Sequence, residues 1–138
     1  MKIPEGYTTV TPYLIVPDCQ RLINFLKEVF GAQELFRMGG DDDRIGHCEM
    51  QLGTSRLMMA DSHPEHPATD VMLYVYVEDV DQTYRKALEK GATSTREPAD
   101  QAYGDRNAGV RDYAGNIWYM ATHKKDVAVE EFAEKASG

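Results

Sequence analysis

The feature that most constrains the fold of this chain is an internal repeat with a period of about 60 residues. The matching segments are residues 16–18 with 77–79, 31–32 with 91–92, and 57–60 with 118–121. Repeats of this length usually arise by duplication of a supersecondary unit. Because there are only two copies, we expect two similar modules that bury their apolar faces against each other or against a second chain.

Each copy has the pattern of one helix and four strands in the order βαβββ. In the first copy the strands are expected over residues 8–16, 33–38, 44–52 and 55–60, with a helix that begins after Asp18 and ends at Gly31. In the second copy the strands are expected over residues 71–77, 92–95, 105–111 and 116–122, with a helix from Asp79 to Leu88 and a long loop over 97–104. A further amphipathic helix is expected over about 126–135.

Length and charge exclude several classes of function. A chain of 138 residues is long enough for a real core without disulfide or metal support. Its net charge of -8 argues against nucleic acid and anionic membranes as partners. The same charge mildly favours a cationic ligand, but solubility alone is the preferred explanation for it. The N-terminal residues lack the pattern of a signal peptide and no apolar run is long enough to span a membrane, so we expect a cytoplasmic protein.

Several local motifs resemble the vicinal-oxygen-chelate superfamily of glyoxalases, bleomycin-resistance proteins and dioxygenases, in particular its PhnB-like branch. They are Val77-Glu78-Asp79-Val80-Asp81 between strand and helix, Lys90-Gly91-Ala92 at the helix exit, Asp112-Tyr113-Ala114-Gly115-Asn116 in a turn, Trp118-Tyr119-Met120-Ala121-Thr122-His123 at the end, and Gly104-Asp105-Arg106 before it. The opening 4–7 and the hairpin 53–58 fit the same branch. Tyr113 stands where the family usually has proline.

The resemblance implies an α+β fold in which two tandem βαβββ modules form a curved, U-shaped mixed sheet with helices on its outer face. The chain is then a single domain, with module 1 over about 8–61, a linker over 62–69, module 2 over about 70–123 and the C-terminal helix. The resemblance also implies a homodimer. Whether the modules pair within one chain or between two chains stays open.

Metal-dependent members of the superfamily hold a divalent cation with two side chains from each module. The corresponding positions here are Thr11, Met58, Met72 and Tyr119. None is a histidine, aspartate or glutamate, which are the ligands that such a cation needs. We therefore expect neither a metal nor another cofactor, and metal-dependent activities such as glyoxalase or extradiol cleavage are not carried over.

Strand periodicity predicts which side chains face a concave cavity. Side chains alternate between the faces of a strand, and the purely apolar sets should pack under the helices. The other sets place these residues on the concave face: Tyr13, His47, Glu49, Met58, Met72, Tyr74, Tyr76, Ile117 and Tyr119. If Gly53-Thr54 is a two-residue turn, Glu49 lies directly opposite Met58. Such an aromatic, methionine-rich surface is typical of a small-molecule site and suits a cationic or aromatic ligand.

The remaining aromatic and polar residues are expected outside the sheet face that lines the cavity. By resemblance, the loop that carries Tyr103, Asp105 and Arg106 borders the cavity mouth, and the alternative is a solvated turn. Trp118 has the opposite parity to Tyr119 and is expected in the core. The remaining histidines receive no site: His63 and His66, with Glu65, are expected in a solvated linker, and His123 lies beyond the last strand.

Three functions remain compatible with these residues. The first is metal-independent binding of a small molecule in the cavity. The second is a metal-independent isomerase, lyase or hydrolase in which His47 and Glu49 form an acid/base pair, since histidine titrates near neutral pH. The third is a structural or regulatory interaction module, which a sealed cavity near Tyr13 and Tyr119 would favour. The first requires the least beyond the residues themselves.

Overall fold

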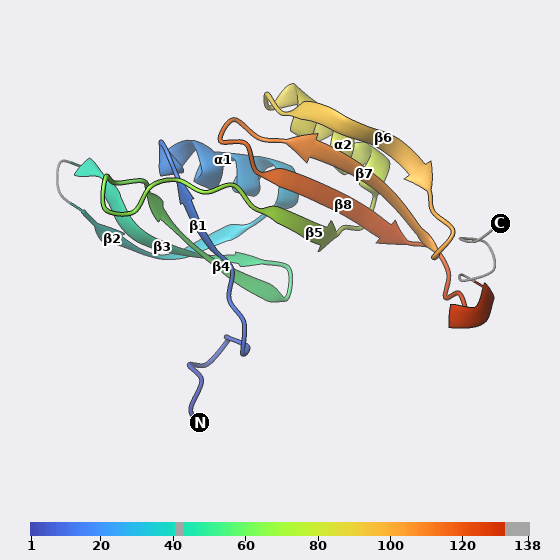
Figure 1. Cartoon of the computed structure of the whole chain (residues 1–138), viewed down its shortest axis with the longest axis horizontal. Helices are drawn as coiled ribbons and strands as arrows, with labels where there is room; N and C mark the ends of the chain where they lie inside the picture. The colour runs from blue at the N-terminus through green and yellow to red at the C-terminus, as the bar shows by residue number, and fades with distance from the viewer. Residues whose placement is uncertain (41–42, 132–138) are drawn as a thin grey trace. The chain divides into compact units, whose positions relative to one another are not determined.

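The computed structural model of the chain describes residues 1–40 and 43–131 (Figure 1). The chain divides into two compact units, Met1–Val71 and Met72–Gly138. Each unit contains a four-stranded mixed sheet and a helix that packs against it. The order of elements is βαβββ in each, so the predicted α+β class and the repeated module are confirmed.

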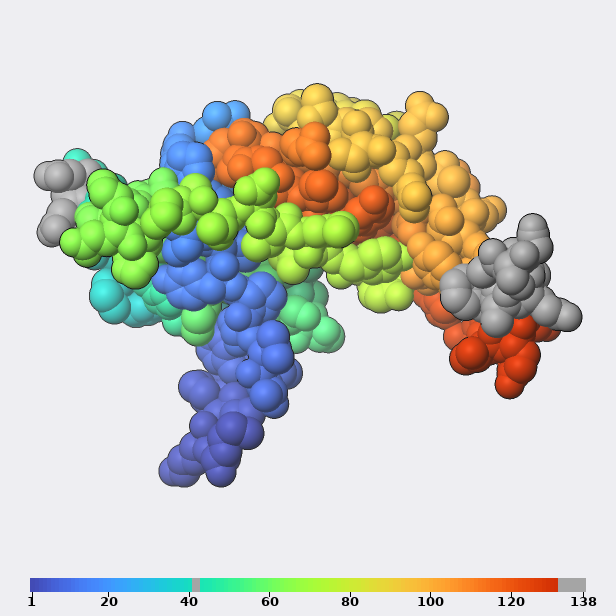
Figure 2. All heavy atoms as spheres, in the orientation of Figure 1, coloured from blue at the N-terminus to red at the C-terminus, as the bar shows by residue number. Residues whose placement is uncertain are grey.

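Unit 1 consists of β1 (Tyr13–Val16), α1 (Cys19–Phe30), β2 (Gln33–Gly39), β3 (Ile45–Leu52) and β4 (Ser55–Asp61). The strand order in its sheet is β1-β4-β3-β2. Strand β1 runs parallel to β4, while the β2–β3 and β3–β4 pairs are antiparallel. The N-terminal segment before β1 projects from the unit, as the dark blue atoms show (Figure 2).

Unit 2 consists of β5 (Met72–Tyr76), α2 (Val80–Glu89), β6 (Thr93–Asp100), β7 (Asp105–Arg111) and β8 (Ile117–His123). Its strand order, β5-β8-β7-β6, repeats that of unit 1, with the parallel pair again between the first and last strands. The repeat in the sequence therefore corresponds to two copies of one topology.

The core of unit 1 lies between α1 and one face of the sheet. The helix buries an apolar stripe, and the alternate residues of β1, β3 and β4 that face it are almost fully buried. Leu14, Met50 and Met59 are 0% exposed. Burying one such side chain stabilises the fold by about 1.5–3 kcal/mol. Trp118 is likewise 0% exposed in unit 2, as its parity predicts.

The first turn of α1 is stabilised differently from the prediction. Asp18 occupies the N-cap position with a left-handed backbone (φ 49°), but its side chain makes no capping hydrogen bond. The backbone N–H of Cys19 instead donates to Asp61 Oδ1 (2.7 Å), and that of Ile45 donates to Asp61 Oδ2 (2.6 Å). One carboxylate at the end of β4 thus connects α1 and β3, whereas in unit 2 Asp79 caps α2 as predicted.

Two predicted strand boundaries were wrong. Strand β1 begins at Tyr13 rather than at residue 8, because proline at position 12 has no N–H to donate to the ladder. Strand β6 continues to Asp100, so half of the predicted loop 97–104 is strand. The reason is that β6 is an edge strand, where Pro98 is tolerated.

The predicted C-terminal helix is only partly described by the structure. Residues 129–131 are helical and 124–128 have no regular structure. The remaining part of the prediction, from residue 132, lies outside the described residues. Neither α1 nor α2 has the length and apolar character needed to cross a membrane, and the described residues contain no other helix that does.

Candidate functional site

In each unit the face of the sheet that lies away from its own helix carries the candidate site; we call it the helix-free face. In unit 1 one row of side chains crosses this face through Tyr13, Met58, Glu49 and Phe36, which are neighbours in register from β1 to β2. The predicted pairing of Glu49 with Met58 is confirmed. Tyr13 and Phe36 are 42% and 48% exposed, so large apolar side chains are left accessible within this unit.

A chain of hydrogen bonds connects four side chains on this face. Tyr7 donates its hydroxyl proton to Glu49 Oε1, and Glu49 Oε2 lies 2.8 Å from His47 Nε2. On the other side of the imidazole ring, Nδ1 lies 2.8 Å from the Tyr13 hydroxyl. The hydrogen bonds from Tyr7 and then His47 lower the pKa of Glu49, so it is a carboxylate at neutral pH. The predicted pair His47 and Glu49 is therefore the centre of a longer network.

A cavity of about 500 Å³ opens next to Tyr13 on the same face of unit 1. Its lining residues are Tyr13, Ile15, Gly40, Arg44, Ile45, Gly46, Ala60, Asp61, His63, Glu65 and His66. Ile15, Ile45 and Ala60 supply an apolar part, and the segment after β4 supplies a polar wall. Glu65 and His66 are exposed, so this wall meets solvent.

The segment after β4 was predicted to be a solvated linker, but part of it belongs to this cavity. His63 and His66 form a tight turn in which each backbone N–H donates to the other's carbonyl, at 3.0 and 2.8 Å. The backbone N–H of Glu65 donates to His63 Nδ1 (3.1 Å). A further bridge between Ile15 and Thr69 returns the segment to β1. These contacts hold the two histidines at the cavity.

In unit 2 the helix-free face carries a hydrogen-bond network around Asp105, which is 4% exposed. The hydroxyls of Tyr74 and Tyr76 donate to its Oδ2 atom at 2.7 and 3.1 Å, and His123 Nδ1 lies 2.7 Å from Oδ1. Burial raises the pKa of Asp105, but the hydrogen bonds from His123 and the two tyrosines outweigh it and lower the pKa. Asn107 donates to the Tyr74 hydroxyl (3.2 Å), which extends the network.

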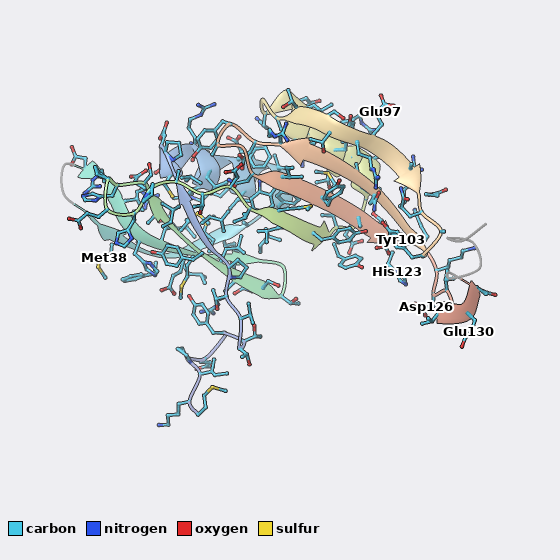
Figure 3. The ribbon with its side chains drawn as sticks, viewed as in Figure 1. Met38, Glu97, Tyr103, His123, Asp126 and Glu130 are labelled. Atoms are coloured by element: carbon cyan, nitrogen blue, oxygen red, sulfur yellow. The ribbon has the colours of Figure 1, made fainter. Side chains whose placement is uncertain are left out.

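Tyr103 joins the same network from the turn before β7. Its hydroxyl accepts a hydrogen bond from Asn107 Nδ2 (2.7 Å). Tyr103, His123 and Asp126 lie at the same end of unit 2 (Figure 3). His123 Nε2 lies 2.7 Å from Asp126 Oδ1, so the imidazole sits between two carboxylates. Hydrogen bonds to Asp105 and then Asp126 raise the pKa of His123.

Two other predicted residues of unit 2 have different surroundings. Tyr119 stacks on Tyr74 with ring centroids 6.2 Å apart, and the Arg96 guanidinium lies 5.8 Å from the Tyr119 ring centroid. Arg106 donates two hydrogen bonds to the carboxylate of Asp81 on α2, at 2.9 and 3.0 Å. The structure therefore places Arg106 with the helix and not with the tyrosines.

The predicted site residues thus fall into two sets, one in each unit. Unit 1 holds Tyr13, His47, Glu49 and Met58, and unit 2 holds Met72, Tyr74, Tyr76, Tyr103, Arg106 and Tyr119. Sequence reasoning did not assign Tyr7 to the site, because only its long-range hydrogen bond to Glu49 places it there. It also missed His123, which has the parity of Tyr119 and would have been found by extending the last strand by one residue.

The residues at the four motif positions for a metal do not fit a divalent cation. They offer one hydroxyl, two thioethers and one phenol: Thr11, Met58, Met72 and Tyr119. Hard and borderline divalent cations need carboxylate or imidazole ligands. In the described ranges, no group of three or more histidine, cysteine, aspartate or glutamate side chains is arranged to hold a metal ion. We derive no chemistry through a metal.

Residues 7–120 match the family model of the Glyoxalase/Bleomycin resistance protein/Dioxygenase superfamily. The chain belongs to this superfamily. An uncharacterized protein of Mycobacterium bovis is 29% identical over 133 residues, which cover 88% of each chain.

Several solved structures share the fold. TioX from Micromonospora sp. ML1 superposes with a TM-score of 0.71 at 25% identity, covering 84% of this chain and 98% of TioX. A Bacillus cereus PhnB protein, described as a putative 3-demethylubiquinone-9 3-methyltransferase, gives a TM-score of 0.69 at 17% identity, covering 83% and 99%. At that identity the PhnB likeness concerns the fold alone.

Proposed function

We propose that this superfamily member binds a small organic molecule, without a metal ion, on the helix-free face of unit 1. The observation that carries the proposal is the cavity of about 500 Å³ beside Tyr13. Ligand sites generally have volumes of about 300–1,000 Å³ and combine apolar walls with a few polar groups. This cavity has both, since Ile15 and Ala60 are apolar and His63 and His66 are polar.

Exposed apolar side chains on β2 support ligand binding over a purely structural role. Phe36 and Met38 on β2 are 48% and 55% exposed. Large apolar groups gathered on one face usually mark a binding surface. A structural module would be favoured by a sealed cavity near Tyr13, and this cavity has exposed residues in its wall.

The proposal extends to the tyrosines of unit 2 as an aromatic ligand surface. Met72 and Tyr76 are 62% and 63% exposed, and Tyr74 is 42% exposed. Tyrosine faces attract cations and aromatic rings. The Arg96 guanidinium already lies over the Tyr119 ring, which illustrates the first kind of contact. The proposed ligand is accordingly cationic or aromatic.

Binding is tested with 8-anilinonaphthalene-1-sulfonate as a fluorescent probe of the cavity. Ala60→Phe places a ring in the cavity wall, and we expect it to weaken binding by at least about tenfold, because filling a cavity removes the contacts of its occupant. Ala102→Phe, in the exposed turn before β7, is the matched control and should bind like the wild type. Equal affinity of the two variants would contradict the proposed site.

Metal independence is tested by native mass spectrometry of the purified protein before and after EDTA. We expect the same mass in both, and probe binding unchanged by the chelator. One divalent ion per chain that EDTA removes together with probe binding would contradict the proposal. The same spectra measure the oligomeric state, for which the family resemblance predicts a homodimer.

A further inference from the structure

The arrangement around His47 shows which group of unit 1 can reach a bound molecule. Both ring nitrogens of His47 have protein partners, Nε2 with Glu49 and Nδ1 with Tyr13. The Tyr13 hydroxyl lies at the end of this series of hydrogen bonds opposite Tyr7. Tyr13 is 42% exposed and lines the cavity, whereas His47 is not among the lining residues. A molecule in the cavity therefore meets Tyr13 and not the imidazole.

The hydrogen-bond donors follow from the charge of Glu49. A carboxylate only accepts hydrogen bonds, so the proton between Glu49 and His47 lies on Nε2. In the neutral ring the other nitrogen is then an acceptor, and the Tyr13 hydroxyl donates to Nδ1. Tyr7 donates to the second oxygen of Glu49 and keeps that carboxylate oriented. This is the order of a hydroxyl, an imidazole and a carboxylate in a catalytic triad.

We propose that Tyr13, His47 and Glu49 form a proton-transfer triad in which Tyr13 is the catalytic residue facing the cavity. The substrate class is a small molecule with an acidic C–H or O–H bond next to a carbonyl group. Its proton passes to the Tyr13 oxygen while the Tyr13 proton passes to His47 Nδ1. The electron pair of the broken bond stays on the substrate, as an enolate or alkoxide. The reverse transfer returns the proton, and return to a different atom isomerises the substrate.

The roles of the three residues are distinct. Burial raises the pKa of Tyr13, so it is a phenol at neutral pH and reacts only as its proton moves to His47. His47 is the base that receives this proton. Glu49 is a positioning residue, because it holds the Nε2–H tautomer and stabilises the imidazolium that forms. Enzymes gain about 10²–10⁴-fold in rate from such positioned proton transfer.

The triad is tested by acetylation with N-acetylimidazole, followed by peptide mass spectrometry. Attack of the tyrosine oxygen on the acetyl carbon breaks the acetyl–nitrogen bond. In Tyr13 the hydroxyl proton moves to His47, and the departing imidazole takes a proton from solvent. Tyr76 is the internal control: its hydroxyl contacts a carboxylate directly, and it is 63% exposed. Exposure alone would make Tyr76 react faster. We expect Tyr13 to react at least about tenfold faster.

The pH profile separates proton transfer from a structural effect. The groups that surround His47 are Tyr13 from β1, Phe36 from β2 and Glu49 from β3, and Tyr7 and Arg56 act on Glu49. Because a neighbouring base takes the Tyr13 proton, we expect Tyr13 acetylation to depend on pH below the range in which phenols ionise, about pH 10. Acetylation of Tyr76 should rise only above the usual range of phenols, because burial and its hydrogen bond to Asp105 raise its pKa.

Two variants complete the test. His47→Gln keeps a polar side chain but no base, and should lower Tyr13 acetylation to the rate of Tyr76 without changing Tyr76. Glu49→Gln should lower the Tyr13 rate and shift its pH profile. If a variant does not fold, the wild-type rates and profile still decide. Tyr13 reacting no faster than Tyr76, or a Tyr13 profile that follows phenol ionisation alone, would overturn the triad.

This inference rests on the proposed cavity for its substrate, but the two can fail separately. Acetylation reports the triad with no ligand bound, while probe binding to Ala60→Phe reports the cavity. Fast acetylation of Tyr13 without probe binding would refute the cavity and keep the triad. Probe binding with slow acetylation would refute the triad and keep the binding function.

Discussion

Asp112 is expected to be a sensitive position for the stability of unit 2. Its carboxylate is 5% exposed and accepts four hydrogen bonds. Oδ1 accepts from the backbone N–H groups of Ala114 (2.9 Å) and Asn116 (3.0 Å). Oδ2 accepts from Asn116 Nδ2 (3.1 Å) and Trp118 Nε1 (2.8 Å). The turn motif between β7 and β8 is therefore closed by one buried acceptor.

The perturbation is Asp112→Asn, which keeps the shape and removes the charge. The amide oxygen can replace Oδ1, but the amide nitrogen then faces Asn116 Nδ2 and Trp118 Nε1, which are donors. Both residues are 0% exposed, so water does not replace the lost acceptor. A hydrogen bond to a charged group contributes about 1.5–3 kcal/mol. Losing two, with partial relaxation, should destabilise unit 2 by about 3 kcal/mol.

Urea unfolding followed by tryptophan fluorescence measures this effect. Trp118 is the only tryptophan in the chain, so the signal reports unit 2. A loss of 3 kcal/mol lowers the urea midpoint by about 1–3 M for m-values typical of small proteins. Glu97→Gln on exposed β6 makes the same kind of change at the surface and should shift stability by less than about 0.5 kcal/mol. Equal midpoints for the two variants would refute this account.

Three further predictions concern other buried or titrating groups. Asp61→Ala removes the acceptor at the starts of α1 and β3 and should cost about 2–4 kcal/mol in urea unfolding monitored by circular dichroism; an unchanged midpoint would contradict it. The hydrogen bond to Asp105 raises the pKa of His123, so protonated His123 stabilises the folded chain. This stabilisation is complete below about pH 6.5 and should disappear as pH rises through the higher folded-state pKa. Tm measured between pH 5.5 and 9 should show the loss in the wild type and not in His123→Asn. Burial raises the pKa of Cys19 to about 12 and that of Cys48 to about 11, so Ellman's reagent at pH 8 should react at least about 10²-fold faster in 8 M urea than with the native chain.

Local sequence patterns were sufficient for most of the fold. The alternation of β3, with Cys48 and Met50 against His47 and Glu49, correctly separated buried from accessible side chains, because strand geometry depends only on the chain itself. Helix ends at Gly31 and Gly91 were likewise correct, because both glycines have positive φ. Strand alternation and helix-ending glycines were predicted correctly because neighbouring residues alone determine them.

The errors occurred where a distant residue decides the structure. Asp18 has the sequence pattern of a helix cap, but Asp61, 43 residues later in the chain, binds the first N–H of α1 instead. Pro98 resembles a strand breaker, yet β6 continues through it because the strand lies at the sheet edge. His63 and His66 are in a proline-rich polar segment, and only the folded unit shows that they line a cavity. Periodicity does not encode these long-range contacts.

The duplicated scaffold supports a different network in each unit, and the reason is steric. Register pairs Glu49 with Met58 in unit 1 and Gly109 with Tyr119 at the corresponding place in unit 2. A Cβ atom on Gly109 would lie 3.1 Å from the Tyr119 ring and 2.5 Å from Thr95 Oγ1, so a larger residue there would require the Thr95 side chain to move.

The flexible Met58 side chain accommodates a carboxylate opposite it, whereas the Tyr119 ring occupies the corresponding space. In unit 2 the carboxylate is instead carried by Asp105 at the start of β7, where tyrosine hydroxyls and His123 surround it. The exchange of methionine for tyrosine at one position of the repeat thus explains why the triad-like arrangement of Tyr13, His47 and Glu49 is confined to unit 1 among the described residues.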